Sequence, residues 1–322
     1  MADAANTEPS ANPARFSLAQ PFDWSRLFFL LQALAGAAWW IMVFTVEGIR
    51  VSTLGGLNPG VLVWMDVPLF VVGSLLLAFG WRRFVWIVLP WILLVTVSLF
   101  AYSLNTRTAG MGALLMIASA FCSTFSAFQL VLGRIPTEYL LHGPFAFRSA
   151  PPTDVHGNLR RTVKQLLVFW TLFLAVIPGI IVVVERRLEI SLEGSMTLLV
   201  LGLVLLLLAS ALGIWSALTM SARGKGTPLP SAMPRKLVIS GPYAFVRNPM
   251  AVAGITQGVA VGLILGSWLV VAYALVGSLL WNWLIRPAEE ANLRENFGEE
   301  FTTYQQRVSC WVPKMRRISA KR

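Results

Sequence analysis

Cysteine, histidine and charged side chains are scarce in this chain. Its 322 residues include two cysteines and two histidines, and only 13% are charged. Cys122 lies inside an apolar run and Cys310 in the polar C-terminal tail, so the two are not expected to meet and no disulfide framework is predicted. His142 and His156 have neither cysteine nor clustered acids nearby, which makes a poor metal site. We therefore predict no bound metal and interpret both histidines as residues of a solvated loop.

Long apolar runs dominate the rest of the chain. Hydrophobic residues make up 56% of it, and the mean hydropathy is +0.68. A helix needs about 20 mainly apolar residues to cross a bilayer. The expected spans are roughly 27–46, 61–80, 84–104, 111–132, 166–184, 196–220, 250–265 and 268–285, the last two separated only by Gly266 and Ser267. The predicted fold is all-α, a polytopic membrane bundle of about eight transmembrane helices.

The net charge of +11 is distributed as the positive-inside rule expects. With the N-terminus inside, only Arg50, Arg107, Arg186 and Arg187 lie outside, and the other 22 of 26 basic residues face the cytoplasm. This sorting argues against nucleic acid as a partner and favours anionic lipid headgroups. We predict cytoplasmic N- and C-termini, and the inner membrane as the location if the source is a bacterium.

Composition divides the chain into four segments. Residues 1–20 are rich in Ala, Pro, Asn and Ser, lack a signal-peptide pattern, and are interpreted as a disordered leader. An N-terminal membrane region of four helices is expected over 21–133, a cytoplasmic loop over 134–165, and a C-terminal membrane region with a tail helix over 166–322. The loop sequence "HGPFAFRSAP" is similar to the later "SGPYAFVRNP". An internal repeat and a coincidence both stay open.

Asp66, in "VLVWMDVPLF", is an acid inside an expected span. An ionisable side chain at membrane depth is costly and is by default a candidate for function. Asp66 lies only about one turn from the end of the span and close to Pro68, where water or freed backbone groups can satisfy it. Both interpretations stay open.

The stretch "GPYAFVRNPM" ends a polar loop and begins an apolar run. Asn248 followed by Pro249 is typical of a helix start, because Asn caps free N–H groups and Pro suits the first helical position. A helix N-terminus also binds anions, and Arg247 beside it offers a fork for a carboxylate or phosphate. Tyr243 and Phe245 add flat faces for an aromatic ring or a cation.

Two acids follow after a hairpin of two spans. Glu289 and Glu290 return to the same membrane face as the "GPYAFVRNPM" stretch, so we expect one pocket between them. Beyond the acids, apolar residues with helical spacing predict an amphipathic tail helix. These residues are Phe297, Phe301, Tyr304 and Val308.

Taken in order, these elements resemble the isoprenylcysteine carboxyl methyltransferase and phospholipid methyltransferase superfamily of membrane enzymes. Its pattern is a G-x-Y turn, Arg-His-Pro or Arg-Asn-Pro, a two-helix hairpin, Glu-Glu, and a Phe-Gly tail, and the match covers roughly 221–313. The resemblance implies S-adenosylmethionine as cofactor. The implied cofactor contacts are Leu237, Val238, Tyr243, Asn248, Pro249, Met250, Ala251 and Glu289. The candidate catalytic residues are Arg247, Glu289 and Glu290, and Arg286 is the candidate substrate-binding residue.

Three departures from the family pattern affect these assignments. Ala251 stands where a tyrosine is usual. Arg286 is displaced by about one position from the basic residue expected just before the acids. The tail reads "RVSCWVPK" in place of a plain Val-Pro ending. The acceptor is either lipophilic or small, and membrane lipids are the expected partners. Two alternatives stay open: a membrane sterol-reductase-like enzyme that uses NADPH, and a non-catalytic scaffold or transporter. Neither a dinucleotide fingerprint after a strand nor a P-loop is present.

Overall fold

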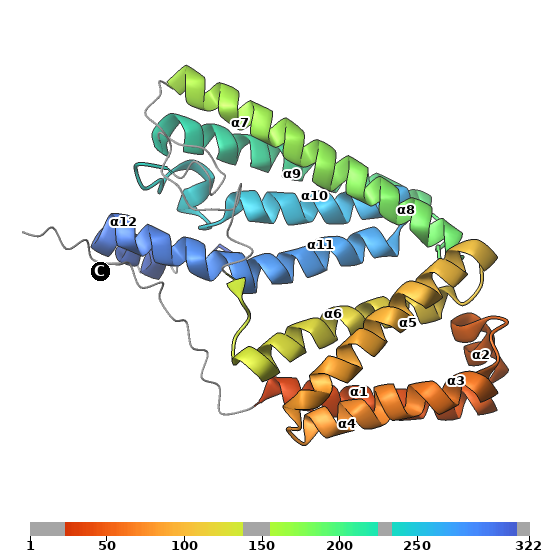
Figure 1. The fold of residues 1–322 in the computed structure, drawn as a ribbon. Coiled ribbons are helices and arrows are strands. Elements are labelled where there is room, and N and C mark those ends of the chain that lie inside the picture. Colours follow the sequence, from red (N-terminus) through yellow and green to blue (C-terminus); the bar gives the residue numbers. More distant parts are fainter. Residues whose placement is uncertain (1–22, 138–154, 225–233, 314–322) are drawn as a thin grey trace, which may run out of the picture. The chain divides into compact units, whose positions relative to one another are not determined.

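The computed structural model describes residues 23–137, 155–224 and 234–313, and every regular element within these ranges is a helix (Figure 1). Seven helices in the described part are long and apolar enough to cross a membrane. They are Trp24–Thr45, Pro59–Ala78, Arg82–Thr106, Gly110–Leu132, His156–Arg187, Met196–Gly224 and Trp268–Arg307. Helix α10 (Pro249–Leu265) is apolar but has only 17 residues. The prediction of an all-α, multi-pass membrane protein is confirmed.

Large apolar side chains cover the outside of these helices. Trp64 is 81% exposed, Trp86 77% and Leu207 72%. Soluble monomers rarely expose continuous apolar surface on this scale. In a bilayer the same surface faces acyl chains, which are as apolar as the side chains themselves.

Contacts divide the chain into two compact units. Unit 1 comprises Met1–Arg50, Leu57–Ser98 and Leu115–Ile135, and unit 2 comprises Val51–Gly56, Leu99–Leu114 and Pro136–Arg322. Helices α2 (Glu47–Leu54), α5 (Val85–Thr106) and α6 (Gly110–Leu132) contribute residues to both units.

Unit 1 is built around a small apolar core. Its other elements are α1 (Trp24–Thr45), α3 (Pro59–Asp66), η1 (Val67–Val72), α4 (Gly73–Ala78) and η2 (Arg82–Phe84). Phe29, Leu77 and Ile92 are fully buried in this core. Gly36 allows α1 to approach η1 closely, because a Cβ there would lie 2.9 Å from the Phe70 ring. Small residues at such crossings are typical of helix packing in membranes.

Asp66 is held by two tryptophans from neighbouring helices of unit 1. The Trp40 indole N–H donates to Oδ2 at 2.8 Å, and the Trp91 indole N–H donates to Oδ1 at 3.0 Å. The sequence suggested water or backbone groups as partners, and the structure shows side-chain donors instead. Hydrogen bonds of this kind join helices inside a bilayer, so Asp66 has a structural explanation.

Unit 2 carries the long helices and the C-terminal tail. Its elements are α7 (Val155–Trp170), η5 (Thr171–Val176), α8 (Ile177–Arg187), α9 (Met196–Gly224), η7 (Gly241–Ala244), α10, α11 (Trp268–Leu280), η8 (Trp281–Ile285) and α12 (Arg286–Arg307). Gly202 brings α9 against α10, because a Cβ there would lie 2.9 Å from the Ala260 carbonyl oxygen. Gly258 does the same for α10 and α11, where a Cβ would lie 2.8 Å from that of Ala274.

The turn between α10 and α11 lies where the sequence predicted the interruption. Gly266 has a φ of +63°, a conformation that favours glycine. Ser267 caps α11 by accepting a hydrogen bond from the Val270 N–H at 3.2 Å. The Ser267 hydroxyl also donates to the buried carboxylate of Glu185 on α8. The hairpin is thereby fixed at the end remote from the candidate site.

Helices α7, η5 and α8 follow one another without a break from Val155 to Arg187. This continuous helix begins well before the span expected at 166, so His156 is an exposed helical residue and its interpretation as a loop residue was wrong. The physical reason is that α7 buries polar side chains against α9. The Thr162 and Ser221 hydroxyls are both buried and lie 2.7 Å apart. His142 and the "HGPFAFRSAP" copy lie outside the described residues.

Candidate active site

The loop before α10 is pinned by the C-terminal tail. Val246 and Ser309 form a parallel bridge. The Arg247 N–H donates to the Ser309 carbonyl at 2.9 Å, and the Asn248 N–H donates to the Cys310 carbonyl at 3.4 Å. Two segments some 60 positions apart therefore lie side by side at the entrance to α10.

Helix α10 begins at Pro249, as predicted, but Asn248 does not cap it with its side chain. The Asn248 amide instead donates to the Cys310 sulfur at 3.3 Å, because the tail lies against this residue. Proline has no N–H, and the N–H groups of Met250 and Ala251 donate to no residue that the structure describes. The start of α10 thus keeps two free donors, which is the usual basis of an anion site.

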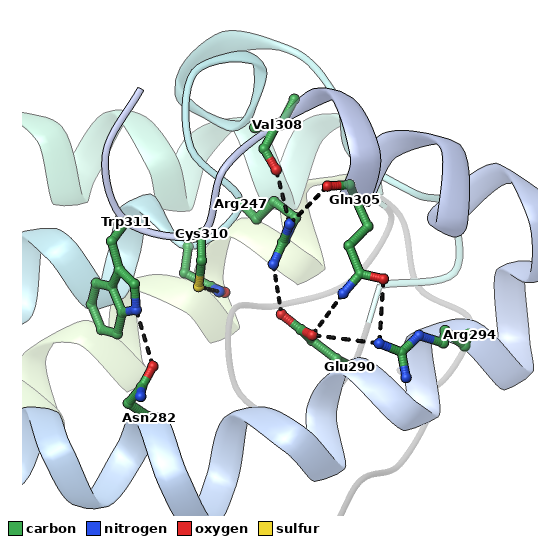
Figure 2. Close-up of polar contacts among 9 residues, drawn as sticks. Arg247, Asn282, Glu290, Arg294, Gln305, Val308, Cys310 and Trp311 are labelled. Carbon is green, nitrogen blue, oxygen red and sulfur yellow. Dashed lines mark hydrogen bonds and ion pairs between the residues drawn. The ribbon is translucent and has the colours of Figure 1, made fainter. Parts of the chain in front are cut away.

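Arg247 is engaged by the protein itself, as Figure 2 shows. Its Nη2 donates to Glu290 Oε1 at 3.0 Å, and its Nη1 donates to the carbonyls of Gln305 at 3.0 Å and Val308 at 2.9 Å. The side chains of Arg247 and Glu290 are only 12% and 13% exposed. The last carbonyls of a helix have no partner within it, so Arg247 both pairs with Glu290 and caps the C-terminus of α12.

Glu290 is the centre of a wider polar cluster (Figure 2). Its Oε2 accepts a hydrogen bond from Gln305 Nε2 at 2.9 Å and lies 3.7 Å from an Arg294 Nη2. Arg294 also donates to Gln305 Oε1 at 3.3 Å. We call Arg247, Glu290, Arg294 and Gln305 the latch cluster. It joins the α10 entrance, the first half of α12 and the second half of α12.

A reversal at Gly298 makes the latch cluster possible. Glu290 and Gln305 are both in α12, and in a straight helix their separation of 15 residues would place them about 22 Å apart. Gly298 has φ +52° and ψ −125°, so α12 is two helical segments joined by a sharp turn. The second segment folds back along the first, and its side chains reach Glu290.

The tail helix buries one apolar face, as its periodicity predicted, and Tyr304 on this face contacts the loop before α10. Phe301 and Tyr304 are buried, whereas Phe297 and Val308 are half-buried. The Tyr304 hydroxyl donates to the Tyr243 carbonyl at 2.6 Å. This contact fixes the G-x-Y turn relative to α12.

Glu289 lies in the first turn of α12 and is half-buried. Within the described ranges, the hydrogen bonds and ion pairs at this part of α12 go to Glu290 and none goes to the Glu289 carboxylate. Burial, and after it the negative charge of Glu289, raises the pKa of the Tyr243 phenol well above its ordinary value. The Arg247–Glu290 pair at 3.0 Å is the contact that brings the α10 entrance and the start of α12 together.

The other predicted site residues are less closely connected. Val238 is buried against the end of α9, since a Cβ on Gly224 would lie 2.9 Å from Val238 Cγ2. Leu237 is half-buried beside it. Arg286, at the start of α12, is half-buried and has a buried Nε without a partner. Tyr243 is only 5% exposed, so its ring offers little free surface.

The sequence reasoning did not identify Gln305, Arg294 or Cys310. Arg294 is an i,i+4 neighbour of Glu290, whereas Gln305 reaches Glu290 only because Gly298 reverses α12, and a long helical pattern gives no indication of such a reversal. Trp311 was missed as well: its indole N–H donates to Asn282 Oδ1 at 3.0 Å and its ring packs edge-on against Trp281. The departure "RVSCWVPK" from the family pattern is the signal that marks this part of the tail.

Comparison with known proteins agrees with the motif analysis. Residues 197–300 match the family model described as phospholipid methyltransferase. Among solved structures, the eukaryotic intramembrane Ras methyltransferase ICMT (isoprenylcysteine carboxyl methyltransferase), without a monobody, is similar at 16% identity and a TM-score of 0.32, over 91% of this chain and 98% of that chain. A comparison with curated proteins gave no match. The family-model match runs from α9 into α12 and supports the superfamily resemblance over that region.

Proposed function

We propose that this chain is an integral membrane methyltransferase that uses S-adenosylmethionine and acts on a lipophilic or small acceptor. One observation carries the proposal: the entrance of α10 and the acids of α12 converge within the region that matches the family. The Arg247–Glu290 pair, at 3.0 Å, joins the two elements directly.

The free groups at this junction fit the cofactor. The unpartnered N–H groups of Met250 and Ala251 suit its carboxylate, because a helix start favours an anion. The unpartnered carboxylate of Glu289 suits its ammonium group or its ribose hydroxyls. Of the expected apolar contacts, Leu237 is half-buried and offers some free surface, whereas Val238 and Tyr243 are buried. When bound, the cofactor supplies a methyl group on a positively charged sulfur.

The chain's own residues then have distinct roles. The latch cluster holds the α10 entrance and Glu289 in one arrangement, and alignment of this kind is a major source of rate acceleration in transfer reactions. Glu289 is the group positioned to accept a proton from an amine or hydroxyl acceptor, whereas a carboxylate or thiolate acceptor needs none. Arg286 is the candidate to contact an anionic part of the acceptor. We assign Arg247 and Glu290 to positioning.

Ligand binding by the purified full-length chain tests this proposal. We expect S-adenosylmethionine to bind by calorimetry and NADPH not to bind. Glu289→Gln keeps the size of the side chain but removes the charge, so binding should weaken at least ten-fold, the effect of losing one charge-assisted hydrogen bond. Glu299→Gln, an exposed substitution on the same helix, is the control and should bind as the unaltered chain does.

Three results would contradict the proposal: equal affinity in both variants, binding of NADPH instead, or binding of neither cofactor.

A second experiment identifies the acceptor. A methyl-labelled cofactor is incubated with the protein and a membrane extract, and the labelled product is identified. Absence of any labelled product, with cofactor binding intact, would separate a binding protein from an enzyme.

A further inference from the structure

The exposed face of α7 changes character along its length. Arg160, Arg161 and Lys164 are all exposed on its first three turns, together with His156. Three residues after Lys164 the same face becomes apolar, with Leu167 60% and Val168 63% exposed. An exposed Leu and Val on a membrane helix face acyl chains, so the boundary between headgroups and hydrocarbon lies near Leu167.

Lys164 lies at the depth of the headgroups, and Arg160 and Arg161 lie just outside this layer. At 1.5 Å per residue, Lys164 is about 4.5 Å and Arg160 about 10 Å from Leu167 along the helix axis. The headgroup layer is roughly 5 to 8 Å thick on each side of the hydrocarbon. Long basic side chains extend several ångströms along the helix and reach groups at this level.

No acidic group neutralises these cations within the described chain. The α7 sequence, VHGNLRRTVKQLLVFW, contains neither Asp nor Glu. Arg160, Arg161 and Lys164 form no ion pair with any residue that the structure describes. Such a cluster at the bilayer surface attracts anionic lipid.

The opposite face of α7 is fixed, so the basic face keeps its orientation. Asn158 and Thr162 are buried, and Thr162 is bonded to Ser221 near the end of α9. Three residues later, the Gly224 carbonyl accepts hydrogen bonds from the N–H groups of Arg235 at 2.9 Å and Lys236 at 3.1 Å. The basic face is therefore on a helix tied to the segment that leads to Leu237 and Val238. Figure 1 shows this end of α7 beside the end of α9.

We propose that Arg160, Arg161 and Lys164 form a docking site for the headgroup of an anionic phospholipid of the surrounding leaflet. The occupant is a membrane lipid, because the three cations lie beside exposed apolar residues that contact acyl chains. A soluble phosphate ion would gain the charge interaction but not this second contact. The site is separate from the proposed methyl-transfer site, and lipid binding to it does not require the cofactor.

Lipid titration of the full-length chain tests the proposal. The purified protein in neutral detergent is titrated with dioleoyl-phosphatidylglycerol or with zwitterionic dioleoyl-phosphatidylcholine, and bound lipid is counted by native mass spectrometry. We expect the unaltered chain to prefer the anionic lipid. Each cation near the surface contributes roughly five-fold in affinity, so the triple variant R160Q/R161Q/K164Q should lose about 100-fold of it at low salt.

The same continuous helix provides the control. Arg186 and Arg187 are exposed at its other end, where the exposed acids Glu189 and Glu193 follow them and offset their charge, so R186Q/R187Q should change the preference by less than about two-fold. R160K/R161K keeps the charges and should keep the binding. If the triple variant does not fold, K164Q alone should weaken binding about five-fold, and 0.5 M salt should weaken binding to the unaltered chain.

Defined results would overturn the proposal. One is an unchanged lipid preference in the triple variant that is also insensitive to salt. Another is an equal loss in R186Q/R187Q, which would show a general charge effect. The third is displacement of the lipid by 10 mM inorganic phosphate, which would identify a soluble anion as the occupant. Calorimetry with S-adenosylmethionine, run on the same samples, reports separately on the proposed function.

Discussion

Arg247→Met tests whether this arginine holds the protein together before any ligand binds. The substitution removes the charge and all donors but keeps much of the apolar stem. It leaves Glu290, which is 13% exposed, without its closest cation, and leaves two carbonyls at the end of α12 without a donor. Removing one partner of a buried, hydrogen-bonded pair costs about 3 to 5 kcal/mol.

Arg294→Met is the matched control because Arg294 contacts the same carboxylate. Its side chain is 48% exposed, and the charged atoms are 3.7 Å apart. Solvent screens such a pair, and exposed pairs contribute about 0 to 1 kcal/mol. Both substitutions remove an arginine from Glu290. The structure predicts that Arg247→Met lowers the free energy of unfolding several-fold more than Arg294→Met does.

The assay is thermal unfolding of the purified chain in detergent without cofactor, combined with limited proteolysis. Arg247→Met should lower the unfolding temperature clearly and should expose the chain beyond Gly298 to protease, because the second segment of α12 loses its tie to the loop. Arg294→Met should do neither. Equal behaviour of the two variants, or an unaltered Arg247→Met protein, would refute the latch and return Arg247 to the role of a ligand contact.

Two further substitutions test the tail. Gly298→Ala places an L-residue at φ +52° and ψ −125°, which costs about 1 to 3 kcal/mol, and its unfolding temperature should fall. Gly277→Ala, where a Cβ meets nothing within 4 Å, should be neutral or slightly stabilising, and a fall of equal size there would contradict the argument. Tyr304→Phe removes the 2.6 Å hydrogen bond to the Tyr243 carbonyl and should cost about 1 kcal/mol. Thr303→Val, an exposed change on the same helix, should leave the unfolding temperature unchanged, and an equal loss there would show that the Tyr304 bond is not the cause.

The spans were predictable because the bilayer imposes length and composition on any helix that crosses it. The same reasoning located the α10–α11 turn at Gly266 and Ser267, where a left-handed glycine and a capping serine follow one another. It failed at the start of α7. Buried polar residues such as Asn158 and Thr162 lower the hydropathy of this segment as loop residues would, although Thr162 is paired with Ser221 on another helix.

The candidate site was predictable in its location but not in its internal connections. Motif order brought the α10 entrance and the two acids together, and the structure places Arg247 against Glu290. The capping role expected for Asn248 did not hold, because the tail occupies its side chain through Cys310. The sequence around Asn248 does not indicate a partner 62 positions away. Only the folded structure shows that the Asn248 side chain bonds Cys310 and does not cap α10.

The hydrogen bonds within the site indicate which residues position the site and which are available to bind a ligand. Arg247 donates three hydrogen bonds to other residues of the chain, and the Glu290 carboxylate accepts hydrogen bonds from both Arg247 and Gln305. Glu290 has little capacity left for a ligand, and Arg247 keeps only its buried Nε without a partner among the described residues. Glu289 and the N–H groups of Met250 and Ala251 do have this capacity, since no described residue satisfies them. Cofactor affinity should therefore follow the charge of Glu289 directly, whereas substitutions of Arg247 should reduce it only through the stability of the α10 entrance.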